Sequence, residues 1–314
     1  MSSINTNIAA MTALQALNQT NKETLVTQNR IATGLRVNDA SDNAAYWSIA
    51  TTMRSDRQAL STVSDALGLG AATVDVAVQG MEGAIKLSSD IKAKLVAARQ
   101  PGVDRAKIQT EITQLQDSLR SVVATSTFSG QNWLATDSTS ATLTRTLVSS
   151  FSRDGAGAIE IGVIEVNVAG NSNPDGPGTM LIDTGGAGDG ILDLTRTATN
   201  SGDFTVLELD ISALTDGADD LQDLEDFITG VDAAITSMTN AATNLGAVKS
   251  RIDLQKGFAD SLMDAIDTGI GQLVDADMNE ESTRLQALQV RQQLGIQALA
   301  LANQSSQSIL SLFR

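Results

Sequence analysis

Residues 53–95 read MRSDRQALSTVSDALGLGAATVDVAVQGMEGAIKLSSDIKAKL, and apolar side chains return in them every seven residues. One row of such positions consists of Met53, Leu60, Leu67, Val74, Met81, Ser88 and Leu95. A companion row consists of Val63, Gly70, Ala77, Ala84 and Ile91. Alternating steps of three and four place both rows on one face of a helix, which must pack against another helix. The small companion residues predict that the two helices approach closely.

The same repeat returns in the second half of the chain. Its main row is Leu224, Val231, Met238, Leu245, Ile252, Ala259, Ile266 and Leu273. The companion row lapses at Lys249 and Lys256. Helices over residues 49–95 and 221–273 would be about 70 and 80 Å long at ~1.5 Å per residue, which predicts a rod. The alternative is a set of shorter helices that break at Gly68, Gly80, Gly83 or Gly230.

Two further segments complete the predicted architecture. Apolar residues in steps of four and three over residues 108–122 predict a third helix, which would make a small antiparallel bundle. Residues 139–216 are rich in glycine and contain alternating stretches at 159–161 and 163–168 that are typical of strands. The fold class expected is therefore mainly α, with a long antiparallel coiled-coil rod and a small β-rich insertion.

Both ends of the chain are amphipathic but almost free of charge. No charged residue precedes Lys22, and none lies between Arg291 and Arg314. The apolar stripes are Ile4, Ile8, Met11, Leu14 and Leu17 at one end and Leu294, Ala298, Leu301, Ile309 and Leu312 at the other. Uncharged polar faces suit helices surrounded by other helices, because a buried charge is costly. The alternative is frayed, low-complexity tails that become ordered only on assembly.

Composition excludes several classes of function. The formal net charge of −16 disfavours binding to nucleic acid and to anionic membranes. Histidine and cysteine are both absent, which removes Ser-His-Asp and Cys-His catalysis and the usual zinc, haem and iron–sulfur sites. We therefore expect neither an enzyme nor a cofactor. The acidic, glycine-rich run 183–189 lacks EF-hand spacing and is typical of turns, and Glu280–Glu281 is interpreted as a helix-start charge cluster.

The first residues contain neither the basic region nor the apolar run of a secretory signal peptide. No stretch reaches the ~18 apolar residues that a membrane-spanning helix needs. These patterns predict a chain that stays in the cytoplasm or leaves the cell by a route without a cleaved signal.

Segments near both ends resemble the bacterial flagellin family. The N-terminal segment is NRIATGLRVNDASDNAAYWSIA at 29–50, and shorter matches are EITQL at 111–115 and FSG at 128–130. The C-terminal segment is QALALANQSSQSILSL at 297–312. The resemblance covers roughly residues 1–138 and 217–314. The pair Tyr46–Trp47 is similar to the flagellins of alphaproteobacteria.

The resemblance implies a subunit that polymerises with identical subunits into the flagellar filament outside the cell and serves motility. Residues 1–35 and 280–314 would form the inner filament core, residues 36–138 and 217–279 the helical rod, and residues 139–216 a variable outer domain. It also implies type III export of the unfolded chain, an export chaperone, and hook-associated junction and cap proteins as partners. Uncharged polar faces would line the export channel.

Other functions remain as alternatives to this one. A hook–filament junction protein would share the terminal helices but usually matches the segment Arg36–Ala50 poorly. A secreted coiled-coil adhesin or effector would not need paired uncharged ends. A flagellin with an embedded zinc protease would need a histidine motif that this chain lacks.

The resemblance also implies altered recognition by immune receptors. Flagellins that the vertebrate toll-like receptor detects carry a Leu-Gln-Arg triplet, and one alignment places Ser89, Asp90 and Ile91 there. The epitope of the plant receptor corresponds to residues 29–50, where Lys-Asp-Asp-Ala-Ala-Gly-Leu is replaced by SDNAAYW. The departures are Ser41, Asn43, Tyr46 and Trp47. We therefore expect weak activation of both receptors. The alternative is that these changes serve only packing along the rod.

Overall fold

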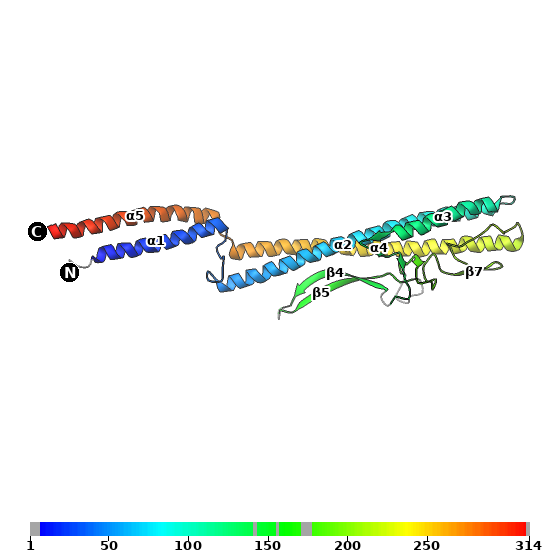
Figure 1. The fold of residues 1–314 in the computed structure, drawn as a ribbon, viewed down its shortest axis with the longest axis horizontal. Coiled ribbons are helices and arrows are strands. Elements are labelled where there is room, and N and C mark those ends of the chain that lie inside the picture. Colours follow the sequence, from blue (N-terminus) through cyan, green and yellow to red (C-terminus); the bar gives the residue numbers. More distant parts are fainter. Residues whose placement is uncertain (1–6, 141–142, 155–156, 171–177, 312–314) are drawn as a thin grey trace. The chain divides into compact units, whose positions relative to one another are not determined.

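The computed structural model describes residues 7–140, 143–154, 157–170 and 178–311, with residues 305–311 described for the backbone alone. Its helices are α1 (Ile8–Thr33), α2 (Ala44–Ala98), α3 (Arg105–Thr125), α4 (Ala218–Val274) and α5 (Met278–Ser311). Its strands are β1 (Thr127–Phe128), β2 (Gln131–Asn132), β3 (Ala135–Thr136), β4 (Thr144–Arg153), β5 (Ile159–Asn167), β6 (Ile182–Asp183), β7 (Arg196–Ala198) and β8 (Gly202–Phe204). The mainly helical class with a small β insertion is confirmed (Figure 1).

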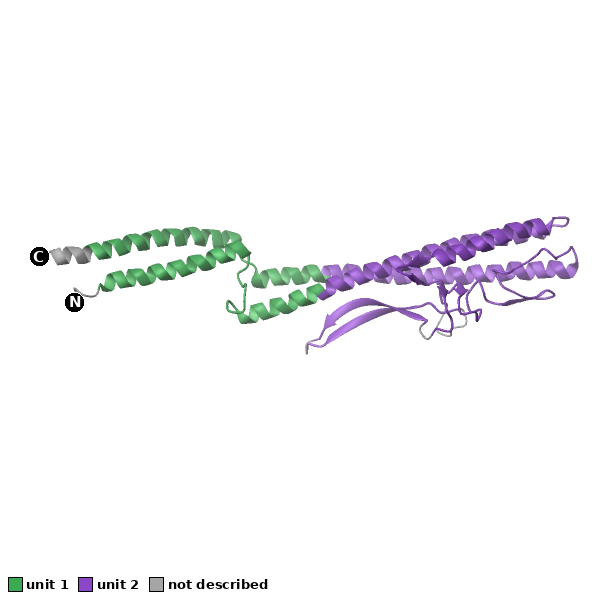
Figure 2. Ribbon diagram, in the orientation of Figure 1, with its two compact units in different colours: residues 1–58, 262–314 green, residues 59–261 purple. Residues whose placement is uncertain are grey.

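The chain divides into two compact units, which are described separately. The first consists of Met1–Gln58 with Leu262–Arg314, and the second of Ala59–Ser261 (Figure 2). In the second unit, α2 and α4 run antiparallel at a fixed register. Polar contacts cross between them at Ser64–Asp260, Asp75–Lys249, Lys92–Asp232 and Arg99–Glu225. Each step forward along α2 is matched by an equal step backward along α4.

The seven-residue rows form the core between these helices. The buried members of the two main rows are Leu60, Leu67, Val74, Met81, Ser88 and Leu95 on α2 and Leu224, Val231, Met238, Leu245, Ile252 and Ala259 on α4. Both helices pass through their glycines without a break, so the long helices are confirmed and the broken alternative is wrong. The lapse in the second companion row has a local cause, because Lys249 pairs with Asp75. This hydrogen bond raises the pKa of Lys249.

A buried arginine fixes the corner where α2 ends and α3 turns back. Arg105 is 6% exposed and donates to the carbonyl of Ala98 at 3.0 Å and to the carbonyl of Leu214 at 3.1 Å. Its guanidinium also pairs with Asp216 at 2.7 Å. The planar fork of arginine suits such a multiple contact. One side chain therefore joins the end of α2, the start of α3 and the segment that leads into α4.

The β insertion packs directly on the helices, at glycines. A Cβ added at Gly80 in α2 would lie 2.6 Å from Leu134 Cδ1, and one at Gly230 in α4 would lie 2.6 Å from Phe204 Cζ. One at Gly70 would lie 3.1 Å from Leu147 in β4. These helix glycines are therefore places of close approach, where a larger residue would force the insertion away.

The strands of the insertion form separate two-stranded pairs. The hairpin β4–β5 is antiparallel with an irregularity after Val148, β7 pairs with β8, and β3 pairs in parallel with β6. The two stretches expected at 159–161 and 163–168 are one strand, β5. Strand structure already begins at Thr127, before the expected insertion. The described part of residues 139–216 shares its apolar core with the helices and belongs to the same compact unit.

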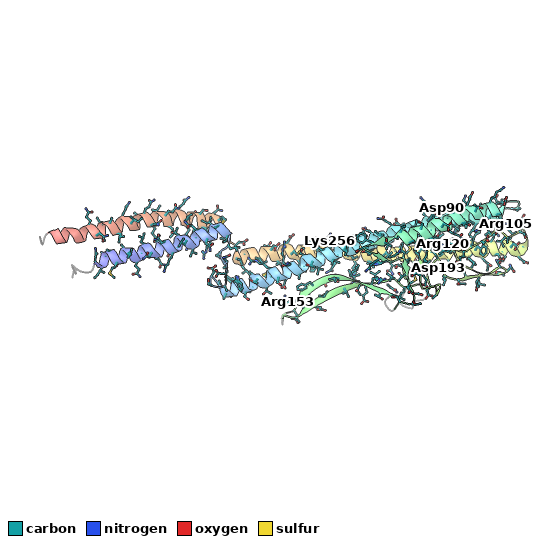
Figure 3. The ribbon with its side chains drawn as sticks, in the orientation of Figure 1. Asp90, Arg105, Arg120, Arg153, Asp193 and Lys256 are labelled. Carbon is teal, nitrogen blue, oxygen red and sulfur yellow. The ribbon has the colours of Figure 1, made fainter. Side chains whose placement is uncertain are left out.

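Polar side chains of α3 hold the irregular segment before α4. Gln116 donates to the carbonyls of Val206 and Leu209, and Arg120 donates to the carbonyl of Leu207 at 2.7 Å. Gln109 donates to the carbonyl of Leu209 and accepts from the backbone N–H of Ile211. Figure 3 shows Arg105 and Arg120 among these side chains. Backbone groups that lack a strand partner are thus satisfied by α3.

We expect alanine at Gly80 or Gly230 to destabilise the second unit by about 1–3 kcal/mol, because the new methyl group overpacks the contact with the insertion. Thermal unfolding followed by circular dichroism measures this. Fluorescence of the buried Trp133 reports whether the insertion stays docked.

The matched control is Gly246→Ala in α4, where an added Cβ meets nothing within 4 Å. It should stabilise the helix by about 0.5–1 kcal/mol, because alanine has the higher helix propensity. Equal effects of all three substitutions would contradict the docking role of Gly80 and Gly230.

Candidate functional site

Helices α1 and α5 of the first unit pack against each other along a seam in which α1 contributes mainly small or polar residues. The inward positions of α1 are Ala10, Ala13, Leu17, Thr20, Thr24, Thr27 and Ile31, and those of α5 are Leu285, Leu288, Gln292, Gly295, Leu299 and Ala302. Both sets repeat in steps of three and four, as in a coiled coil. The hydroxyl groups of Thr20 and Thr24 donate to carbonyls of their own helix. The leucines of α5 therefore meet few large apolar partners on α1.

Specific polar contacts set the register of this pair. Asn7 donates to the carbonyl of Ala302 at 3.0 Å, and Gln292 donates to Asn21 at 2.9 Å. At the other end, Arg30 and the buried Glu281 form an ion pair at 3.0 Å. Removing one partner of a buried pair leaves the other charge uncompensated, so this contact favours a single register.

Most large apolar residues of the two helices are exposed in the single chain. On α1, Ile8 is 66% exposed, Met11 64% and Leu14 48%. The others that are exposed are Leu25, Val26, Met278, Val290, Leu294, Ile296 and Leu301. By helical periodicity, all of these positions except Met278 lie off the seam. The α1–α5 pair thus carries more large apolar residues outside its seam than within it.

The predicted assembly residues therefore fall into different environments. Ile8, Met11, Leu14, Leu294, Ala298 and Leu301 are exposed, whereas Leu17 is half-buried in the seam. Ile4 and Leu312 lie outside the described residues, and Ile309 is described for its backbone alone. Among the predicted rod residues of this unit, Met53, Ile266 and Leu273 are half-buried, and Arg57 pairs with Asp267 at 3.0 Å.

The three residues aligned with the receptor triplet are not equivalent. Ser89 and Asp90 are exposed on α2, but Ile91 is fully buried in its core. A receptor cannot contact a side chain in that position. The alignment that equates Ile91 with an exposed arginine is therefore wrong by at least one residue, and an arginine there would be forced into an apolar core.

The four residues that depart from the plant-receptor epitope lie at the start of α2 or just before it. Ser41 donates twice to Asp39, at 2.8 and 2.5 Å. Asn43 caps the helix, since its Oδ1 accepts from the backbone N–H groups of Ala45 and Tyr46. Tyr46 and Trp47 are 41% and 37% exposed, respectively. Asn43 thus has a structural role, and the two rings are partly open to solvent.

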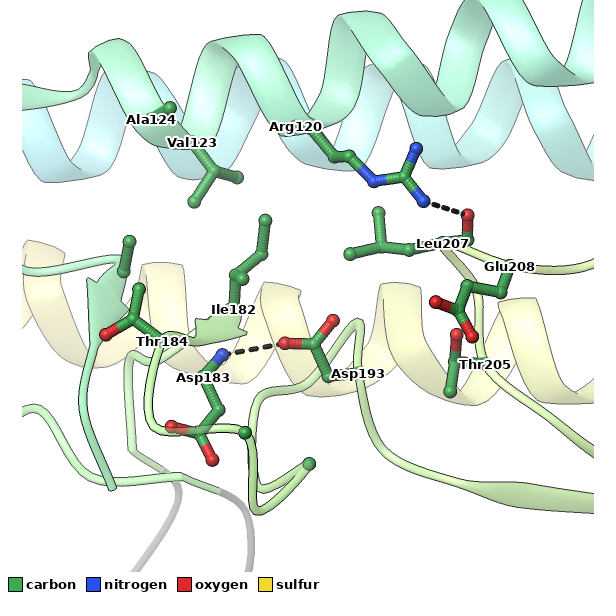
Figure 4. Close-up of a pocket in the computed structure, with 13 residues that line it drawn as sticks. Arg120, Val123, Ala124, Ile182, Asp183, Thr184, Asp193, Thr205, Leu207 and Glu208 are labelled. Atoms are coloured by element: carbon green, nitrogen blue, oxygen red, sulfur yellow. Dashed lines mark hydrogen bonds between the residues drawn. The ribbon is translucent and has the colours of Figure 1, made fainter. Parts of the chain in front are cut away.

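A cavity of about 580 Å³ lies between α3 and the insertion (Figure 4). Asp183 and Asp193 lie at its edge, and Asp193 accepts from the backbone N–H of Asp183 at 2.7 Å. Burial acts to raise the pKa of Asp183, but hydrogen bonds from Ser138, Gly185 and Asp189 outweigh it and lower this pKa to about 2. Burial raises the pKa of Asp193. The run 183–189 is a turn built around one carboxylate.

Among the residues that the structure describes, no cluster of three acidic, histidine or cysteine residues is arranged to bind a metal ion. In the same part of the chain, no helix combines the length and the apolar character needed to cross a bilayer.

Comparison with known proteins gives consistent matches along the chain. The description "bacterial flagellin N-terminal helical region" matches residues 4–139, and "bacterial flagellin C-terminal helical region" matches residues 228–313. The chain is 46% identical to Flagellin C and 43% identical to Flagellin A of Rhizobium meliloti strain 1021. It is 43% identical to a flagellin of Brucella melitensis. All three matches cover 100% of both chains.

The chain belongs to the bacterial flagellin family. Flagellins are the structural subunits of the flagellar filament, so the expected family and function are confirmed, and the junction-protein alternative is not favoured. In this flagellin the seam between α1 and α5 was not predicted from the sequence, because the prediction considered only the largest apolar residues. The steps of three and four at Ala10, Ala13, Leu17 and Thr20 were the signal for it.

We expect Asp183→Asn in this flagellin to lose about 2 kcal/mol of stability at pH 7, because the carboxylate accepts several backbone N–H groups. The folded pKa lies below the usual 3.8, so this contribution is fully present above that pH. It disappears as the pH falls towards 2. Chemical denaturation at pH 7 and pH 2.5 measures the difference between wild type and variant. A difference that does not shrink in acid would contradict the account.

Proposed function

We propose that this flagellin polymerises through the outward faces of α1 and α5, which pack against the same helices of identical subunits in the filament core. The observation that carries the proposal is the apolar outside of the α1–α5 pair, with Leu14, Leu294 and Leu301 exposed in the single chain. Apolar side chains in such numbers on one surface favour association with other chains. The lack of charged residues before Lys22 and between Arg291 and Arg314 permits burial of these parts of the faces.

The positions of the other segments in the filament follow from this placement of α1 and α5. Residues 1–35 and 280–314 form the inner core of the filament, residues 36–138 and 217–279 form the surrounding rod, and residues 139–216 face outward. The role is structural rather than catalytic, and the filament serves swimming motility.

Export precedes assembly in this proposal. The unfolded chain binds an export chaperone, passes through the type III export apparatus without a cleaved signal, and joins a filament bounded by hook-associated junction and cap proteins. Glutamine and asparagine on the inner faces, such as Gln15 and Gln297, line the channel without charge.

We expect Leu14→Lys and Leu301→Lys each to raise the monomer concentration needed for polymerisation by about 100-fold or more. Each lysine places an unpaired ammonium group in a subunit interface, which costs several kcal/mol. Both side chains are exposed in the single chain, so its helix content should not change. Sedimentation and electron microscopy of the purified chain measure polymerisation.

The matched control is Gln114→Lys, which adds the same charge at an exposed position of α3. It should polymerise normally. Removal of residues 294–314 should abolish filaments and leave the second unit helical. Normal filaments from the truncated chain would refute the assignment of the core.

We expect this flagellin to activate the vertebrate receptor weakly, because the exposed positions Ser89 and Asp90 offer no cation in the triplet region. Receptor-bearing reporter cells, treated beside a flagellin with the Leu-Gln-Arg triplet, measure potency. Asp90→Arg should raise potency, whereas Ile91→Arg should unfold the core instead. Equal potency of the two unmodified flagellins would contradict the proposal. The segment 41–47 should likewise make the plant receptor respond weakly.

A further inference from the structure

A second cavity lies in the second unit, beside the hairpin β4–β5. Its volume is about 260 Å³, and uncharged residues of α2, of the 128–133 segment and of β4 line it. Leu69 and Val148 at this cavity are 55% and 38% exposed. Trp133 also lines it, is 2% exposed, and its indole N–H finds no acceptor among the described residues. The exposed apolar side chains at this cavity favour an occupant with an apolar surface.

The chain also carries an aromatic pair that is only partly covered by the described part of the chain. Tyr46, Trp47 and Ile49 are 41%, 37% and 49% exposed at the start of α2. Aromatic residues make up only 3% of the chain, so two adjacent exposed rings are unusual for this composition. Tyrosine and tryptophan, whose aromatic rings carry one polar atom each, are enriched at protein interfaces.

Residues of opposite charge lie near the two sites, and the Lys256 ammonium also lies close to the cavity, beside Gly68. Arg54 lies two turns after Trp47 on α2 and makes no ion pair with any described residue. Near the cavity, Asp65 lies one helical turn before Leu69 on α2. Glu165 of β5 lies opposite Thr146 of β4 in the hairpin register, and Thr146 is one of the residues that line the cavity. Both carboxylates are exposed and unpaired within the described chain. A guanidinium beside the rings would therefore meet two carboxylates at the rim.

We propose that Tyr46 and Trp47 of one subunit dock into this cavity of a second copy of the chain, with Arg54 facing Asp65 and Glu165. Both sites include α2, a single helix of 55 residues, and two distant points on one helix cannot contact each other. A second copy must therefore supply the rings. A contact between two different surfaces of identical chains generates a helical filament when its rotation does not close into a ring.

This inference rests on the proposed polymerisation, and cross-linking separates the two. The native chain has no cysteine, so Thr51→Cys with Gln131→Cys creates a unique pair of thiols, one turn after Trp47 and at the cavity. A short bifunctional thiol reagent should join subunits into ladders in filaments but not in dilute monomer. The control pair Thr51→Cys with Gln114→Cys should give none. Both pairs replace exposed residues and leave the rings in place.

Charge reversal supplies the second measurement. Arg54→Glu should raise the monomer concentration needed for polymerisation about tenfold, and adding Asp65→Arg with Glu165→Arg should restore it. Trp47→Ala should raise it about 30-fold, as expected for a central aromatic contact. Normal filaments that show no ladder for the 51–131 pair, or no rescue by charge reversal, would overturn this inference and leave the proposed function standing. Failure of the wild-type chain to polymerise would overturn both.

Discussion

The antiparallel seam between α2 and α4 is the interaction on which the second unit depends. Seven-residue rows on both helices meet at one register, and ion pairs such as Lys92–Asp232 and Arg99–Glu225 follow the same register on the surface. Exposed pairs of this kind add little stability each, so the buried Leu, Val, Ile and Met residues hold the helices together. The pairs act mainly to disfavour a shifted register.

That register decides where the insertion can rest. Gly80 and Gly230 lie on different helices, yet both contact the insertion, at Leu134 and Phe204. A shift of one residue in either helix would replace a glycine by a side chain at these contacts. The side chains of α3, with Gln116 and Arg120, then satisfy a backbone segment that has no sheet of its own. A poorly regular insertion is therefore held by the helices rather than by its strands.

The first unit follows a different design. On the α1 side its seam is mostly alanine and threonine, so the inward leucines of α5 have few large partners, while Ile8, Met11 and Leu301 lie on the outside. Such a pair of helices gains less stability from burial in its own seam than it would gain from burial against a neighbouring chain. Together with the family to which the chain belongs, this distribution explains why a single subunit can carry so much exposed apolar surface. In the proposed filament, other subunits supply the burial that this unit lacks.

The sequence by itself determined the long helices, the lack of metal-binding and nucleophilic chemistry that depends on histidine or cysteine, and the family. A seven-residue apolar period can bury its stripe only by packing one helix against another, and a missing residue type cannot be replaced by folding. Tertiary structure alone decided which face of α1 is inside, because Leu14 and Leu17 belong to one apolar stripe in sequence but only Leu17 lies in the seam. It also decided that Ile91 is buried while Asp90 is exposed, and that the insertion shares the helical core. The apolar pattern of a segment determines the period of its helix. Which face of the helix is buried depends on the element that packs against it, and that element lies far away in the sequence.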